Sequence, residues 1–157
     1  MNHIEFLPFN QVGSDDLMAI LNEDCLRTHL IDHPYFDSAS VQIWMADKIK
    51  VDAMPGCRVR AVSINGVLAG WCGIQPDDDS VELAIVISQQ FWGFGRAIFK
   101  SLIGWANELG HTEVVFHLLD SRPEYKALDK IAINVHKTEQ LGRCFTTYRL
   151  SVAGQCT

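Results

Sequence analysis

The segment of residues 81–119 constrains the fold more than any other part of the sequence. It contains two apolar runs, VELAIVIS at 81–88 and TEVVFHLL at 112–119. Between them, residues 96–110 place apolar side chains at helical spacing, and Gly110 suits the left-handed position just after a helix. Two apolar strands joined by a helix are typical of a parallel β-α-β crossover in the middle of a sheet. We therefore predict that strand 81–88 is buried on both faces.

Antiparallel strands are predicted on the N-terminal side of this unit. Asn65-Gly66 is the preferred pair for a two-residue type I′ hairpin, because both positions need positive φ. Paired strands are therefore expected near 57–64 and 67–74. A short apolar segment at 3–9 is typical of a first strand.

Helices are predicted on either side of this hairpin. Residues 13–30 have helical apolar spacing with Ser14 as the expected N-cap, and residues 40–54 form a second amphipathic helix. A short helix at 122–132 and a hairpin at 133–152 close the chain. The order β-α-α-β-β-β-α-β-α-β-β predicts one α/β domain over residues 1–157. Its sheet is mixed and mostly antiparallel, with a parallel β-α-β unit at the centre.

Charge and cysteine content limit the classes of partner. The net charge of −6 argues against a nucleic-acid backbone, because such sites need clustered Lys and Arg, and it slightly favours cationic amines. The five cysteines are scattered without zinc-site spacing, so we expect reduced thiols in the cytoplasm. We expect no membrane partner, because no apolar stretch is long enough to span a bilayer, and the first residues do not resemble a signal peptide.

The segment QQFWGFG at 89–95 joins the apolar strand to the following helix. Free main-chain N–H groups and the helix dipole favour anions at such a helix start. Gly93 and Gly95 would let a phosphate approach the main chain, and Arg96 would add a charged contact. Nucleotide motifs fit poorly: no Lys-Ser/Thr pair follows Gly95, as in a P-loop, and Ile98 replaces the third small residue of the dinucleotide fingerprint.

Residues 90–95 match the signature Q/R-x-x-G-x-G/A, and through it the chain resembles the GNAT superfamily of acyl-CoA-dependent N-acetyltransferases. The stretch 81–110 looks most like the branch that acts on ribosomal-protein N-termini. In that branch a V-E-[IL] strand leads to a Y/F-W-G-x-G segment and a helix ending near W-A-x-x-x-L-G. The hairpin NGVLAGWCGI at 65–74 also resembles that family's central hairpin. The resemblance covers most of the chain and preserves the order of the elements.

The resemblance implies a site for acetyl-CoA as the acyl donor, with no metal. The pyrophosphate would sit on the main-chain amides of residues 91–96. The pantetheine arm would pair with residues 85–87 as a surrogate strand, and a main-chain amide of that strand would stabilise the oxyanion. The residues implied in binding are Ile85, Val86, Ile87, Gln90, Phe91, Trp92, Gly93, Phe94, Gly95 and Arg96.

Glu82 is the first candidate catalytic residue. It is the only charged residue in the apolar strand 81–88, where a carboxylate is costly unless it is paired or solvated. The family often places its general base on this strand. The alternative is a salt bridge at the end of the strand.

Tyr125 is the second candidate. The family's short helix after the fifth strand carries L-Y-E-K-L-G-F, and its tyrosine protonates the departing CoA thiolate. Here Leu128 or Asp129, depending on register, takes that position. Leucine cannot donate a proton, and an exposed aspartate is ionised at neutral pH. Tyr125 shares a helical face with Leu128 and is predicted as the substitute acid; the alternative is packing against the sheet.

Several other side chains have open interpretations. His117 is either a hydrogen-bonded core residue or an acid/base group. His29 and His33 lack a third metal ligand, so their segment is more readily interpreted as lining an acceptor site. Trp92 either covers the cofactor or wedges its segment against the protein.

Taken together, these features predict an N-acyltransferase that uses acetyl-CoA or a similar acyl-CoA and a primary amine, with a protein N-terminus among the candidate acceptors. A homodimer is compatible with the sequence. Two alternatives stay open: a non-catalytic module of the same fold that binds CoA or a protein, and a structural or assembly protein that reuses the fold.

Overall fold

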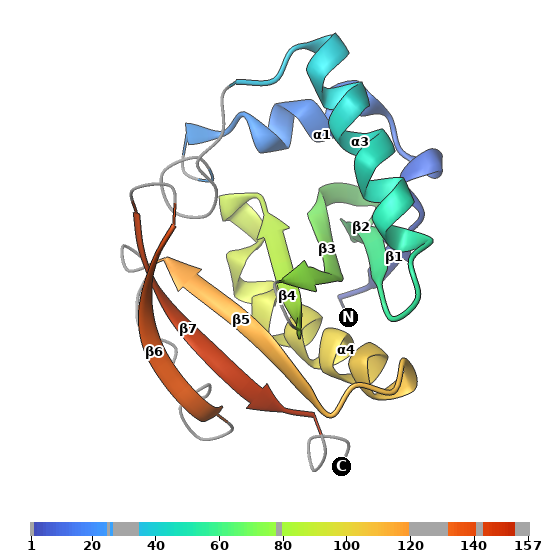
Figure 1. Cartoon of the computed structure of the whole chain (residues 1–157). Coiled ribbons are helices and arrows are strands. Elements are labelled where there is room, and N and C mark those ends of the chain that lie inside the picture. Colours follow the sequence, from blue (N-terminus) through green and yellow to red (C-terminus); the bar gives the residue numbers. More distant parts are fainter. Residues whose placement is uncertain are drawn as a thin grey trace.

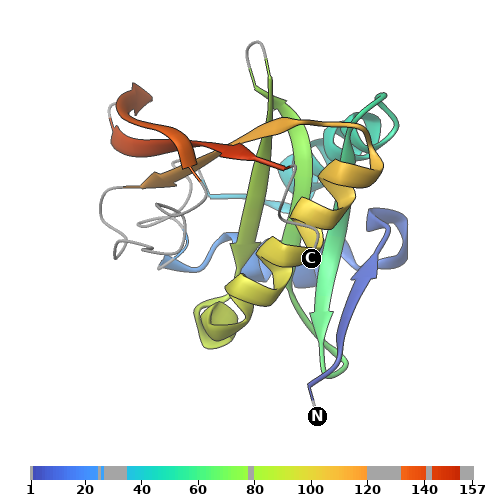
Figure 2. The same cartoon turned by 90° about the horizontal axis from the view of Figure 1, so that it is seen from below.

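The computed structural model describes residues 2–24, 26, 35–77, 80–119, 132–140 and 143–152. They form a seven-stranded sheet in the order β1-β2-β3-β4-β5-β7-β6. Only the β4–β5 pair is parallel. Figures 1 and 2 show the helices on both sides of this sheet. The predicted α/β class and mixed, mostly antiparallel sheet are confirmed.

The strands have the following bounds: β1 Ile4–Leu7, β2 Arg58–Ile64, β3 Val67–Asp77, β4 Ser80–Ile87, β5 Glu113–Leu119, β6 Ala132–Gln140 and β7 Arg143–Ser151. The helices are α1 Ser14–Leu21, α3 Ser38–Asp52 and α4 Gly95–Glu108, with the short 3-10 helices η1 Phe9–Gln11 and η2 Gln89–Phe94. Residues 122–131 of the predicted helix at 122–132 lie outside the described residues, and its last residue, Ala132, is the first residue of β6.

Two hydrophobic clusters form the core, one on each face of the sheet. Alternate residues of β2, β3 and β4 point to opposite faces, because successive side chains of a strand alternate. One cluster packs α4 against the sheet through Ile98, Leu102 and Ala106. The other packs α1 and α3 through residues such as Leu17 and Val41, together with Trp71 of β3.

The predicted hairpin is confirmed at its turn. Asn65 and Gly66 have φ of 54° and 82°, as a type I′ turn requires. They join β2 and β3, which pair antiparallel from Arg58↔Ile74 to Ile64↔Val67. Gly110, at φ 87°, ends α4 in the predicted left-handed conformation.

The first predicted helix is shorter than its apolar spacing indicates. Helix α1 ends at Leu21, and its N-cap is Gly13 rather than Ser14. The side chain of Asn22 explains the early end, since it accepts from the Phe36 N–H and donates to the Phe36 carbonyl. That pairing ties the end of α1 to the segment before α3, so the chain turns there instead of continuing as a helix.

Helix α3 starts two residues before its predicted position. Asp37 is the N-cap: its side chain accepts from the Ser40 N–H while the Ser40 hydroxyl accepts from the Asp37 N–H. This reciprocal capping box satisfies two N–H groups at the helix start.

Candidate active site

Strand β4 separates from β5 close to Glu82. The two strands share a single register pair, Glu82↔Val115, whereas the opposite edge of β5 pairs along its whole length with β7. Figure 1 shows β4 (lime) and β5 (orange) diverging towards their C-terminal ends. Beyond Glu82, residues 83–87 pair with β3 on one side and have no partner strand on the other among the described residues. An extended ligand could therefore use this edge as an additional strand would.

Burial along β4 differs from the prediction. Leu83, Val86 and Ile87 are buried, but the remaining residues of the strand, Ile85 among them, are only partly covered. The predicted burial is confirmed in part: Leu83 and Ile87 pack into one hydrophobic cluster and Val86 into the other, on the opposite face of the sheet. The other residues of β4 are only partly covered by the described residues.

The segment after β4 is a 3-10 helix rather than the predicted open loop. Helix η2 runs directly into α4, with Ser88 as its N-cap. The Phe91 N–H donates to the Ser88 carbonyl at 2.8 Å, and the Gly95 N–H donates to the Trp92 carbonyl. A 3-10 helix pairs N–H groups with carbonyls three residues earlier in its own turns, so at least two of the six amides expected to face a phosphate, those of Phe91 and Gly95, already have main-chain partners.

Gly93 and Gly95 leave open space beside η2. Neither glycine has positive φ, and a Cβ added to either would have no atom within 4 Å beyond its chain neighbours. The fold of this segment therefore does not itself require glycine at either position. Gly93 and the Arg96 side chain are exposed, and Gly95 is half-buried at the first residue of α4.

Trp92 wedges η2 against the protein. Its indole N–H donates to the Ile87 carbonyl at 2.9 Å, and its ring packs against both hydrophobic clusters. Phe91 and Phe94 also pack against one cluster, with ring centroids 6.3 Å apart. Of the two interpretations of Trp92, the structure shows the wedge.

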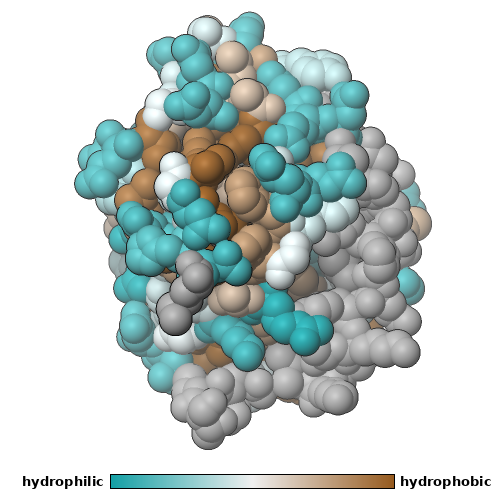
Figure 3. All heavy atoms as spheres, turned by 180° about the vertical axis from the view of Figure 1, so that it is seen from behind, coloured by the Kyte–Doolittle hydropathy of each residue, from teal (hydrophilic) through white to brown (hydrophobic). Residues whose placement is uncertain are grey.

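Figure 3 shows an apolar hollow, bordered by hydrophilic side chains, on the face opposite to that of Figure 1.

Glu82 lies in a polar network where β4 begins to diverge. Gln75, its register partner on β3, donates from Nε2 to Glu82 Oε1 at 2.7 Å. The Lys48 ammonium group of α3 donates to Gln75 Oε1 at 2.6 Å and lies 4.6 Å from the centroid of the Trp71 ring. The sequence analysis did not single out Gln75 or Lys48, because only the register of β3 and the packing of α3 bring them to Glu82.

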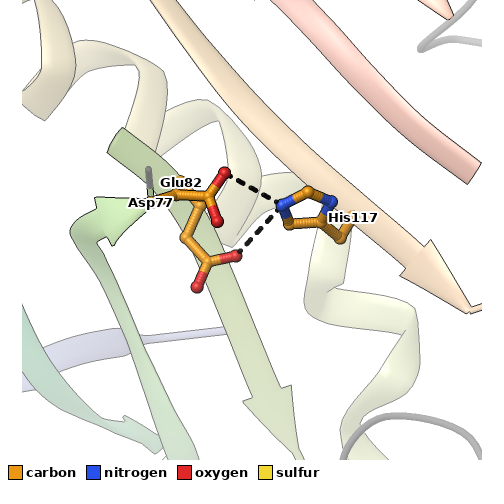
Figure 4. A group of neighbouring side chains, drawn as sticks. All are labelled: Asp77, Glu82 and His117. Carbon is orange, nitrogen blue, oxygen red and sulfur yellow. Dashed lines mark hydrogen bonds and ion pairs between the residues drawn. The ribbon is translucent and has the colours of Figure 1, made fainter. Parts of the chain in front are cut away.

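His117 and Asp77 complete this network (Figure 4). The His117 Nε2 lies 3.2 Å from Asp77 Oδ2 and 3.7 Å from Glu82 Oε2. Its Nδ1 lies 2.8 Å from the Thr147 hydroxyl oxygen on β7. His117 is thus both partly buried and hydrogen-bonded, and it faces the candidate base.

Burial changes the acidity of two groups in the network. It raises the pKa of Glu82, and the nearby Asp77 carboxylate raises it further, against the opposing effects of Gln75, His117 and Lys48. Burial lowers the pKa of Lys48, although Glu82 and Asp47 oppose that shift. A carboxylate with a raised pKa accepts a proton more readily, which suits a general base.

Glu23, which the sequence analysis did not single out, lies at the other end of β4. The buried Ser88 hydroxyl is 2.9 Å from both oxygens of the Glu23 carboxylate. This contact ties the segment after α1 to the start of η2. No motif in the sequence identifies the pair, because 65 residues separate them.

The other candidate residues cannot be placed. Tyr125, His29 and His33 lie outside the described residues, as do both positions compared with the family's tyrosine, Leu128 and Asp129. The three described cysteines, Cys57, Cys72 and Cys144, are free thiols. Among the described helices, none has the length and apolar character needed to span a bilayer.

Comparison with solved structures assigns the architecture to the GNAT fold. A GNAT-family acetyltransferase from Streptococcus pneumoniae superposes with a TM-score of 0.63 at 17% identity, covering 96% of this chain and 98% of its own. A spermidine N-acetyltransferase chimera of Vibrio cholerae SpeG and hSSAT gives 0.72 at 14% identity, covering 98% and 97%. The YncA protein of Salmonella typhimurium, solved with its cofactor acetyl-CoA, gives 0.64 at 17% identity, covering 100% and 97%.

Sequence comparison adds nothing to this structural likeness. No protein-family model matches the chain, and no curated protein matches it. The likeness therefore establishes the fold, and the activity has to be argued from the site.

Proposed function

We propose that this protein transfers an acetyl or other short acyl group from acyl-CoA to a primary amine. The observation that carries the proposal is the parting of β4 from β5 at Glu82. It places a strand edge, which none of the described strands pairs with, between a partly buried carboxylate at one end and the glycines of η2 at the other. The GNAT fold agrees with this assignment, and the YncA structure of the same fold holds acetyl-CoA.

The donor would lie along β4. Its pantetheine arm would pair with the main chain of Ile85, Val86 and Ile87, beside the edge that β5 leaves open. Its pyrophosphate would lie against η2, where Gly93 and Gly95 leave room for close approach and Arg96 supplies a positive charge. The side chains of Gln90, Phe91 and Phe94 would border this end of the donor.

Glu82 would act as the general base. A lysine-like amine has a pKa near 10.4, so at neutral pH most of it carries an additional proton that must be removed before attack. Glu82, directly or through a water, would accept that proton, and the neutral amine nitrogen would then attack the thioester carbonyl carbon and lose a second proton to solvent as the tetrahedral intermediate collapses. A main-chain N–H of β4 would stabilise the oxyanion. The carbon–sulfur bond then breaks, giving the amide and the CoA thiolate.

The acceptor is proposed only as a primary amine. A protein N-terminus is one candidate, from the resemblance to the ribosomal-protein branch. A small cationic amine is another, because the protein is acidic and the site contains Asp77 as well as Glu82. We further propose that the reaction takes place in the cytoplasm.

Acetyl-CoA binding provides the first test. We expect the ligand at a hundred times its dissociation constant to raise the free energy of unfolding by about 2.7 kcal/mol. Thermal unfolding with and without acetyl-CoA measures this, and desulfo-CoA tests whether recognition needs the thiol end. No stabilisation at millimolar acetyl-CoA would favour a structural or assembly protein.

Thiol release then separates an enzyme from a CoA-binding module. The acceptor panel should contain peptides with free N-termini, the same peptides with acetylated N-termini, and polyamines. If one acceptor makes thiol release faster than it is without that acceptor, the protein is an enzyme and the acceptor shows its substrate class. Binding without accelerated thiol release from any acceptor would favour the non-catalytic module.

Tyr125 is proposed as the acid that protonates the departing thiolate. A CoA thiolate is a tolerable leaving group, so we expect Tyr125→Phe to lower kcat by about ten- to hundredfold while acetyl-CoA affinity is kept. Tyr35→Phe is the matched control, because Tyr35 is exposed and bonds to Asp24. An unchanged kcat in Tyr125→Phe would mean that water protonates the thiolate.

A further inference from the structure

We propose that Asp77, Glu82 and His117 form a binding site for a divalent cation, best suited to Zn²⁺, and that the ion inhibits acyl transfer by occupying Glu82. The first half of this proposal stands on the geometry of the three side chains. The second half rests on the proposed function, because only a base that is needed can be blocked.

The three ligand atoms converge from three strands. One carboxylate oxygen of Asp77, one of Glu82 and the Nε2 of His117 all lie within 4.8 Å of one another. A tetrahedral zinc ion with ligands at about 2.0–2.1 Å has edges of about 3.4 Å between its ligand atoms. The observed separations of 3.2 Å from His117 Nε2 to Asp77 Oδ2 and 3.7 Å to Glu82 Oε2 lie on either side of that value. The nitrogen and both oxygens could therefore bind one ion with only small movements.

Two of the three ligands are oriented by bonds from their other polar atoms. With its proton on Nδ1, His117 donates to the Thr147 hydroxyl, which leaves the Nε2 lone pair facing the carboxylates. Thr147 is itself buried, at 3% exposure. Glu82 Oε1 accepts from Gln75, which leaves Oε2 facing His117. Such outer bonds fix the tautomer and direction of zinc ligands in proteins.

The charge and exposure of the cluster suit an ion that enters from solvent. Two carboxylates carry the −2 charge that a divalent cation neutralises. The His117, Asp77 and Glu82 side chains retain 12%, 24% and 22% exposure, so the site is partly buried but accessible. Three protein ligands leave a fourth position for water, as in open zinc sites.

The ligand set distinguishes among ions. Magnesium and calcium prefer oxygen ligands, whereas one imidazole with two carboxylates suits Zn²⁺ and the neighbouring first-row metals.

Direct binding tests the first half of the proposal. The full chain, freed of metal by a chelator and kept reduced with a phosphine, is titrated with ZnCl₂ in competition with a chromophoric chelator. We expect one zinc ion per chain, with affinity falling at least about tenfold in His117→Gln and Asp77→Asn. His136→Gln is the matched control, because His136 is an exposed histidine of β6 outside the cluster. Far-UV circular dichroism in chelator verifies that each variant is folded, and Glu82→Gln replaces any variant that is not.

The results separate the two halves of the proposal. Loss of zinc binding in the cluster variants, but not in His136→Gln, supports the site. No binding by the unmodified chain, or equal binding by all variants, overturns it without affecting the proposed acyl transfer. Thiol release with and without zinc then tests inhibition: transfer by the unmodified chain should fall, and the zinc concentration for half inhibition should rise at least about tenfold in Asp77→Asn. Zinc binding without inhibition would overturn the regulatory half alone.

Discussion

Replacement of Gly93 by valine is expected to weaken acetyl-CoA binding by about ten- to hundredfold. The physical reason is the space beside η2, where a Cβ on Gly93 would meet no atom within 4 Å beyond its neighbours in the chain. In the proposed complex the pyrophosphate lies in that space, so a branched side chain would push it away from the amides. Losing one hydrogen bond to a charged group costs about 1.5–3 kcal/mol, and each 1.4 kcal/mol is a tenfold change in the dissociation constant.

The same observation makes Gly93→Val a clean probe. The Cβ of a valine would meet no atom within 4 Å beyond its chain neighbours at this position, and valine is a better helix former than glycine, so we expect the free energy of unfolding not to fall. Gly104→Val is the matched control, because a Cβ on Gly104 in the middle of α4 also meets no atom within 4 Å. Isothermal titration with acetyl-CoA measures both variants. A folded Gly93→Val protein with normal affinity would rule out the proposed pyrophosphate position.

The sequence predicts the fold best where local chemistry determines the backbone. Asn65-Gly66 fixes a hairpin because few other pairs adopt positive φ at both positions. The helix of the β4-α4-β5 unit is predicted equally well, because its apolar stripe packs against the sheet and Gly110 adopts the left-handed conformation just after its end. The predicted bounds of a helix are wrong where a contact between residues distant in sequence determines where the helix ends. Helix α1 ends early because Asn22 bonds to Phe36, and spacing within the helix carries no sign of that bond.

The candidate site was predictable only in part for the same reason. Glu82 attracts attention because it is a carboxylate in an apolar strand. His117 is also a candidate, as a histidine in an apolar strand, but Gln75 and Asp77 lie in ordinary surroundings in the sequence, and strand register brings all three to Glu82. The composition of the two strands does not predict the parting of β4 from β5, because both are apolar; only the family resemblance implies an open edge at residues 85–87.

Glu82→Gln is expected to lower kcat/KM by about a hundredfold near neutral pH, with a deficit that shrinks as the pH rises. Removal of a general base typically costs 10²–10⁴-fold. Without Glu82, the reaction depends on amine that has already lost its proton in solution, and this fraction grows with pH towards the amine pKa near 10.4. The unmodified protein should lose activity at low pH as Glu82 becomes protonated. Since burial and Asp77 raise the pKa of Glu82 despite Gln75, His117 and Lys48, this acidic limb should lie above the ordinary carboxyl value of 4.5.

The free energy of unfolding provides a control for Glu82→Gln. The direction of its change follows from the raised pKa of Glu82. A raised pKa in the folded state means that the ionised carboxylate destabilises the fold. The destabilisation is absent below the unfolded-state pKa and complete above the folded-state pKa. Glutamine is neutral and can still accept from Gln75, so Glu82→Gln should unfold at the same or a higher temperature at pH 8. Glu113→Gln removes an exposed carboxylate of β5 that pairs with Arg149, and it should change neither kcat/KM nor the pH profile. If Glu82→Gln had the same pH profile as the unmodified protein and bound acetyl-CoA equally well, Glu82 would be a structural partner of His117, and the amine would be deprotonated elsewhere.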